Sequence, residues 1–95
     1  MIENNNQTTD YKYILLHSDG QFERVYPKNL KDKKNIINAD RISIIGNSTH
    51  DLVFIFNELM FGLQLNIVAT QLAQTNLYGS VLIEDREHKF KHLLN

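Results

Sequence analysis

The sequence predicts a small α+β domain, in which a mostly antiparallel sheet is packed by two short helices in the order ββαββαβ. Three observations predict this fold class. An Asp-Gly pair at positions 19–20 separates two apolar-rich segments, which is the strongest short-range signal of a β-hairpin. Residues 52–56 are all apolar and have the length of a buried strand. Apolar residues at positions 65, 68, 69 and 72 have the spacing of a helix that packs on one side.

The first half of the chain is expected to form the hairpin and a short helix. Segments 12–17 and 21–26 are its strands, joined by a two-residue turn at Asp19-Gly20, because both residues tolerate the positive φ of a type I′ turn. Pro27 ends the second strand, since it has no N–H to donate to a ladder. Segment 29–38 follows with helical spacing. Asn29 is its candidate cap, and one face carries Leu30, Lys33 or Lys34, and Ile37.

The second half is expected to add two strands, a helix and a third strand. The strands at 41–45 and 52–56 flank a turn at Gly46-Asn47-Ser48. The helix at 65–74 is predicted to turn Leu65, Val68, Ala69 and Leu72 inward, and a strand follows at 77–84. Segment 85–95 fits either a short strand or a terminal helix. Residues 11–95 thus make one domain, and the amide-rich residues 1–10 are predicted to form a loose tail.

Composition limits the class of protein. A chain of 95 residues buries about 60–65% of its unfolded surface, and with 42% apolar residues its core is thin, which favours a homo-oligomer. The absence of cysteine excludes disulfides, zinc thiolates and a cysteine nucleophile. A net charge of −1 argues against a dedicated nucleic-acid binder. The short apolar runs and the polar N-terminus predict a cytoplasmic protein without a membrane segment or signal peptide.

The expected hairpin has one aromatic face. With a two-residue turn, the pairs His17–Phe22, Leu15–Arg24 and Tyr13–Tyr26 share this face, and Leu16–Glu23 and Ile14–Val25 share the other. The interpretation that we prefer is that the aromatic face packs on a helix or a second subunit. The alternative is a platform on which a base stacks while Arg24 binds a phosphate. The candidate ligand-binding residues here are Tyr13, His17, Phe22, Arg24 and Tyr26.

A second candidate site is the turn-rich segment after the apolar strand. Asn57 and Asn66 accept left-handed backbone and bond their own main chain, so a structural role in a tight connection is the preferred interpretation. The functional alternative is that Asn57, Gln64 and Asn66 present amide groups to a ligand or partner. If Asn66 caps the following helix, the first helical turn also offers N–H groups to an anion.

Other motifs indicate no catalytic chemistry. Ser48-Thr49-His50-Asp51 has the residue types of a hydrolase triad, but adjacent side chains diverge too much to form the relayed hydrogen bonds of a triad. His88 and His92 have the spacing of a helical metal pair without an evident third ligand. The lysines between positions 28 and 34 are explained by a solvated helix face. We therefore expect no enzyme, no metal site and no cofactor.

Part of the pattern resembles a known family. The apolar strand is followed by Asn57-Glu58, then by Gly62-Leu63-Gln64-Leu65-Asn66 with Ala69, and later by Gly79-Ser80-Val81-Leu82-Ile83. This order, over residues 51–85, resembles short phage, plasmid and bacterial domains grouped as domain of unknown function 3846, in which proline usually stands at the position of Gln64. The resemblance implies an origin in a mobile element. It implies no activity.

Three classes of function fit these observations. The one that we favour is a phage or mobile-element anti-defence protein, an oligomer that sequesters a nucleotide-like immune signalling molecule without transforming it. The second is a protein–protein inhibitor of a host defence enzyme of the CRISPR or restriction type. The third is a scaffolding accessory of replication or host takeover. The expected partner is thus a nucleotide-like small molecule or a host defence protein, and neither a membrane nor nucleic acid.

Overall fold

The computed structural model describes residues 13–47 and 52–85. The predicted tail 1–10, the triad-like residues 48–51, and His88 and His92 therefore lie outside the described residues. The described elements are β1 (Tyr13–Leu16), β2 (Phe22–Arg24), α2 (Leu30–Ile36), β3 (Ile42–Asn47), β4 (Leu52–Asn57), α3 (Ile67–Ala73) and β5 (Val81–Asp85). The predicted α+β fold and the order ββαββαβ are confirmed.

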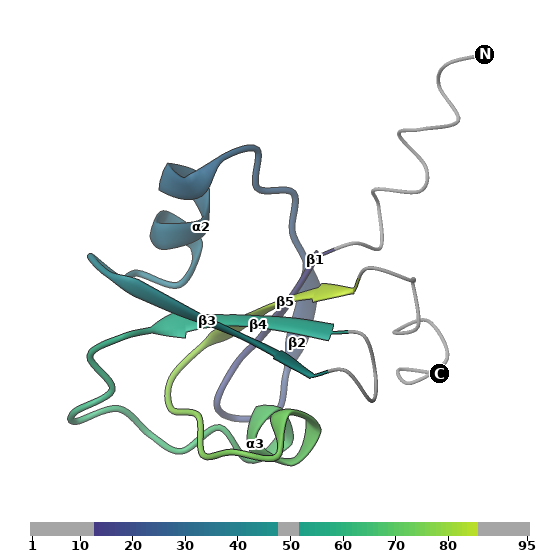
Figure 1. Cartoon of the computed structure of the whole chain (residues 1–95), viewed down its shortest axis with the longest axis vertical. Helices are drawn as coiled ribbons and strands as arrows, with labels where there is room; N and C mark the ends of the chain where they lie inside the picture. The colour runs from purple at the N-terminus through teal and green to yellow at the C-terminus, as the bar shows by residue number, and fades with distance from the viewer. Residues whose placement is uncertain (1–12, 48–51, 86–95) are drawn as a thin grey trace.

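Within the described residues the strands form one antiparallel sheet in the order β2-β1-β5-β4-β3 (Figure 1). The hairpins β1–β2 and β3–β4 form its two sides, and β5 enters between them, paired to both β1 and β4. Because β5 is central and covered on both faces, its residues Val81, Leu82 and Ile83 are all fully buried.

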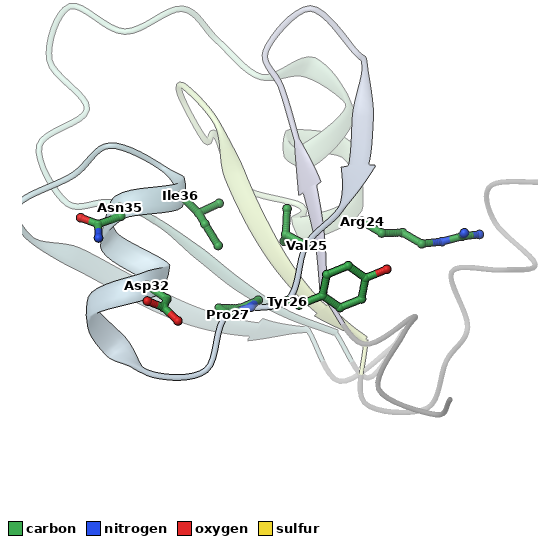
Figure 2. A pocket seen from close by; sticks show the side chains of 7 residues that line it. All are labelled: Arg24, Val25, Tyr26, Pro27, Asp32, Asn35 and Ile36. Carbon is green, nitrogen blue, oxygen red and sulfur yellow. The ribbon is translucent and has the colours of Figure 1, made fainter. Parts of the chain in front are cut away.

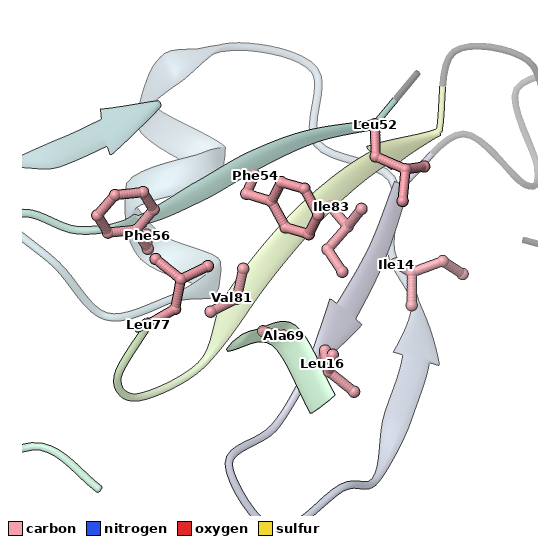
Figure 3. Close-up of a cluster of buried hydrophobic side chains, with 9 residues drawn as sticks. All are labelled: Ile14, Leu16, Leu52, Phe54, Phe56, Ala69, Leu77, Val81 and Ile83. Carbon is pink, nitrogen blue, oxygen red and sulfur yellow. The ribbon is translucent and has the colours of Figure 1, made fainter. Parts of the chain in front are cut away.

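The two helices cover opposite faces of the sheet (Figure 1). On one face, Ala69 of α3 packs on side chains from β1, β4 and β5 (Figure 3). This α3-side core comprises Ile14, Leu16, Leu52, Phe54, Phe56, Ala69, Leu77, Val81 and Ile83. On the other face, Ile36 and Ile37 from the end of α2 pack on Leu15, Ile55 and Leu82, the α2-side core. The alternation of side chains along each strand divides the apolar residues between the two cores.

Asn29 caps α2 as predicted. Its side-chain Oδ1 accepts a hydrogen bond from the N–H of Asp32 at 2.9 Å, and the carboxylate of Asp32 accepts from the N–H of Lys28 at 2.9 Å. The residues that were predicted to share a face of this helix differ in burial. Ile37 is buried, but Leu30 is exposed, because only the C-terminal end of this short helix lies on the sheet.

Two other sequence expectations need correction. β3 does not stop at Ile45: it continues through Gly46 and Asn47, which pair with Val53 and Leu52, so the predicted turn at Gly46-Asn47 is strand. In α3, Ala69 is buried and Leu72 is partly buried, as predicted. Leu65 and Val68 are exposed instead, because the helix begins only at Ile67 and a seven-residue helix places few side chains on the sheet.

Candidate functional site

The register of the β1–β2 hairpin differs from the predicted one by one residue. Leu15 pairs with Glu23, not with Arg24, and Leu16 pairs with Phe22. The N–H of His17 donates to the carbonyl of Gln21 at 2.8 Å, which leaves Ser18, Asp19 and Gly20 as a three-residue loop. Gly20 has a φ of 95°, and Asp19 is not among the residues of positive φ, so this is not the type I′ turn that was predicted.

This register splits the predicted aromatic face. Tyr13 and His17 lie on the α2 side of β1, whereas Phe22 and Arg24 lie on the α3 side of β2, because a shift of one residue moves every side chain of a strand to the other face. The set of Tyr13, His17, Phe22, Arg24 and Tyr26 is therefore not one stacking platform, and that prediction was wrong.

The residues of the predicted platform have separate surroundings. The Nζ atom of Lys33 on α2 lies 5.3 Å from the ring centroid of Tyr13. His17 Nε2 lies 2.9 Å from a carboxylate oxygen of Glu23, and His17 Nδ1 lies 3.5 Å from Ser80 Oγ. Both residues are thus engaged in local contacts on the α2 side.

Arg24 and Tyr26 do come together, at a shallow hollow between the end of β2 and α2. The hollow has a volume of about 450 Å³ and is lined by Arg24, Val25, Tyr26, Pro27, Asp32, Asn35 and Ile36. Figure 2 shows Val25 and Ile36 pointing into the space between the two elements, with the guanidinium of Arg24 extending away from α2. The exposed residues of this lining are Arg24, Tyr26 and Asn35.

In the second predicted site, the one formed by Asn57, Gln64 and Asn66, the side chain of Asn66 is buried and makes three hydrogen bonds to the backbone. Its Oδ1 accepts from the N–H of Ala69 at 3.1 Å, which confirms the helix cap, and its Nδ2 donates to the carbonyls of Leu16 (3.0 Å) and Gly79 (2.8 Å). The residue is fully buried, so its amide is not available to a ligand. Its role is structural: it ties the start of α3 to the end of β1.

Asn57 and Gln64 also support the chain locally. Asn57 Oδ1 accepts from the N–H of Leu59 at 2.9 Å in an Asx turn, which bends the chain as β4 ends. The side chain of Gln64 is exposed, and the backbone carbonyl of Gln64 accepts a hydrogen bond from the N–H of Gly79 at 2.7 Å. The structure does not bring the three amides together as one recognition surface.

The connection from β4 to α3 exposes an unusual amount of apolar surface. Six large apolar side chains within ten residues are exposed, and Phe61 is 100% accessible. We call them the 59–68 apolar surface: Leu59, Phe61, Leu63, Leu65, Ile67 and Val68. Sequence reasoning missed this surface because the stretch was interpreted as a strand, a turn and an inward helix face. The available signal was an apolar residue at every second position from 59 to 67 in a segment with turn residues.

Backbone hydrogen bonds fix this segment against the body of the domain. The N–H of Leu63 donates to the carbonyl of Met60 at 3.1 Å, which closes a turn around Phe61 and Gly62, and Gly62 has a φ of 82°. The N–H of Asn66 donates to the carbonyl of Leu77 at 2.8 Å. Gly79 has a φ of 77°, a backbone conformation that favours glycine. A Cβ at this position would lie 2.9 Å from Cδ1 of Leu63, so the leucine side chain would have to shift.

The segment is also free of charge. No Asp, Glu, Lys or Arg occurs between Glu58 and Glu84, so neither the apolar connection nor α3 carries a cation that would bind a phosphate. Exposed apolar area of this kind is typical of a surface that contacts another protein.

No protein-family model, no curated protein and no solved structure matches this chain. The resemblance to domain of unknown function 3846 therefore stays a prediction. Among residues 13–47 and 52–85, no three His, Cys, Asp or Glu side chains gather as a metal site would require. The helices in this part of the chain are too short and too polar to cross a membrane.

Proposed function

We propose that this protein is a non-enzymatic binding protein that contacts a protein partner through the 59–68 apolar surface. The observation that carries the proposal is the full exposure of Phe61 among five other exposed apolar side chains. Leaving such area in water is unfavourable by roughly 25 cal/mol per Å² of apolar surface, and a partner that covers it recovers this free energy.

The form of the segment supports binding with little loss of entropy. The turn at Met60–Leu63 and the bonds from Asn66 and Gly79 hold the apolar side chains on a fixed backbone before any partner arrives. Fixed aromatic side chains are common binding hot spots because they bury a large area at a small entropic cost. Because residues 59–83 contain no Asp, Glu, Lys or Arg, this surface suits a partner with an apolar pocket better than a partner with phosphate groups.

Because the sequence resembles mobile-element domains, we propose that the partner is a host defence enzyme. We place the protein among anti-defence factors, as an inhibitor that covers a functional surface of a host defence enzyme in the host cytoplasm.

The test of this proposal uses Phe61→Ala. Tagged wild-type protein is used to capture a stoichiometric host protein, which is then purified and titrated against each variant by calorimetry. We expect Phe61→Ala to weaken binding by about 30-fold, as for a hot-spot aromatic. The control is Tyr26→Ala, which removes an exposed aromatic at the hollow and is expected to bind normally. A captured partner with equal affinity for wild type, Phe61→Ala and Ile67→Lys would refute the proposal, as would the failure of defence enzymes to bind or be inhibited.

A second candidate function is favoured by the hollow. Among its lining residues, Tyr26 offers an exposed aromatic ring and Asn35 an amide, which are groups that suit a nucleotide-like ligand. Such a ligand at 100 times its dissociation constant stabilises the folded state by about 2.7 kcal/mol. We therefore expect a rise in melting temperature of about 10 °C or more, lost in both Tyr26→Ala and Asn35→Ala. The measurement is a thermal-shift panel of cyclic and ADP-ribose-like nucleotides, and an unchanged melting temperature throughout would exclude this function.

A further inference from the structure

Strand β3 is an edge of the sheet that lacks the usual protection of an edge. Among the described residues, no strand pairs with its outer side. Its sequence, ISIIGN, contains no charge and no proline, and its pairing with β4 runs without a bulge from Ile42 to Asn47. Natural edge strands are commonly blunted by lysine, proline, bulges or short length. The opposite edge, β2, has such features: it is three residues long and contains Glu23 and Arg24.

The ladder with β4 indicates which backbone groups of β3 point outward. The N–H of Glu58 donates to the carbonyl of Arg41 at 3.0 Å, and these two residues lie opposite each other in the register of the hairpin. Opposite residues in an antiparallel pair alternate between bonded and non-bonded. The residues bonded to β4 are thus Arg41, Ser43, Ile45 and Asn47, and Ile42, Ile44 and Gly46 turn their N–H and C=O groups away from the sheet.

Ile44 marks the middle of this free edge. Its side chain is 59% exposed, although its neighbours across the sheet, Ile55 and Leu82, are almost completely buried in the α2-side core. The apolar row therefore runs across the sheet and ends in solvent at Ile44.

We propose that a second copy of this chain pairs antiparallel along β3, with a two-fold axis at Ile44. In this register Ile44 lies opposite Ile44 of the partner subunit, and Ile42 lies opposite Gly46 of the partner subunit. All three outward-facing residues of each copy then fall in bonded pairs, which satisfies three donors and three acceptors on each side. The two five-stranded sheets become one continuous sheet, and each Ile44 side chain covers the other.

A second copy is the occupant that this edge fits because an antiparallel edge is complementary to itself under a two-fold axis. The pairing is also compatible in shape and charge. Gly46 has no side chain to oppose the Ile42 side chain, and the flanking cation Arg41 falls opposite the uncharged Asn47, so no like charges meet. This inference is independent of the partner surface proposed above, because β3 and residues 59–68 are different segments.

The test is the mass in solution of the full chain and of Ile44→Lys, measured by sedimentation over concentrations from about 1 μM to 1 mM. We expect the wild type to reach twice the chain mass of 11.1 kDa and the lysine variant to dimerise at least about tenfold more weakly, since it places two like charges face to face. Ile44→Pro is expected to have the same effect. It removes an outward N–H and leaves the bonds to β4, so circular dichroism and the melting transition remain those of a folded protein.

The matched control is Ile67→Lys, because Ile67 is 58% exposed on α3 and far from β3 in sequence. The Ile67→Lys variant is expected to stay dimeric and to lose binding to the protein partner. The Ile44→Lys variant is expected to become monomeric and to keep binding to that partner. Hydrogen exchange adds a direct readout, with the amides of Ile42, Ile44 and Gly46 protected in the dimer. A wild type that is monomeric at 1 mM, a dimer that survives both Ile44 variants, or protection that arises only with another protein on this edge would overturn the proposal.

Discussion

Replacing Asn66 with alanine is expected to lower the free energy of unfolding by about 3–7 kcal/mol. The change removes the cap of α3, worth about 1 kcal/mol, and leaves the carbonyls of Leu16 and Gly79 without this donor, at about 1–3 kcal/mol for each buried group. Urea unfolding followed by circular dichroism measures the loss, with an unchanged slope as evidence that the native fold is retained.

Two variants separate the contributions of Asn66. Asn66→Ser keeps a capping oxygen but is too short to reach both carbonyls, so it is expected to recover only about 1 kcal/mol relative to alanine. Asn29→Ala removes a cap of the same residue type at α2, where the side chain has the single partner Asp32, and should cost about 1 kcal/mol. Equal losses for Asn66→Ala and Asn29→Ala would show that the two bridging bonds contribute nothing.

Replacing Phe54 with alanine is expected to lower the free energy of unfolding by about 3–5 kcal/mol. The side chain is completely buried in the α3-side core, beside Ile83 on β5 (Figure 3). Phe54 also lies opposite Ile45 on β3 in the register of the hairpin. A domain of this size has a total stability of about 5–15 kcal/mol, so the variant is close to the unfolding threshold at 37 °C. Thermal unfolding measures this change in the free energy of unfolding. A decrease of less than about 1 kcal/mol would contradict the burial of Phe54 in this core.

Phe61→Ala is the matched control for this core variant. It makes the same chemical change at a side chain that is 100% exposed, so the free energy of unfolding should change by less than about 0.5 kcal/mol. The pair of phenylalanines thus separates a contribution to folding from one to binding: Phe54 stabilises the domain, and Phe61 is available to a partner.

The site and the fold are linked through Asn66. This residue joins the end of β1, the chain before β5 and the start of α3, and the 59–68 apolar surface ends at that junction. A structural amide therefore positions a surface that it does not itself form. In the Asn57–Asn66 region, the amides of Asn57 and Asn66 support the backbone, and the adjacent apolar side chains are the exposed ones.

The hairpin shows why local signals predict an element and miss its register. Ser18-Asp19-Gly20 is compatible with a two-residue turn and with a three-residue loop that has Gly20 in the left-handed region. The observed register places Val25 next to Tyr13 in the α2-side core, where the predicted register would pair Val25 with Ile14 on the other face. Packing against α2 therefore selects between two loops that the local sequence permits.

The sequence by itself determined the order of the elements, the helix caps at Asn29 and Asn66, and the buried strands, because these depend on spacing and chemistry within a few residues. Only the tertiary structure decided the hairpin register, the insertion of β5 between β1 and β4, the placement of the helices on opposite faces, and the exposure of residues 59–68. These features depend on contacts between distant parts of the chain. The bond from Asn66 to Leu16 spans 50 positions, and no local pattern specifies it.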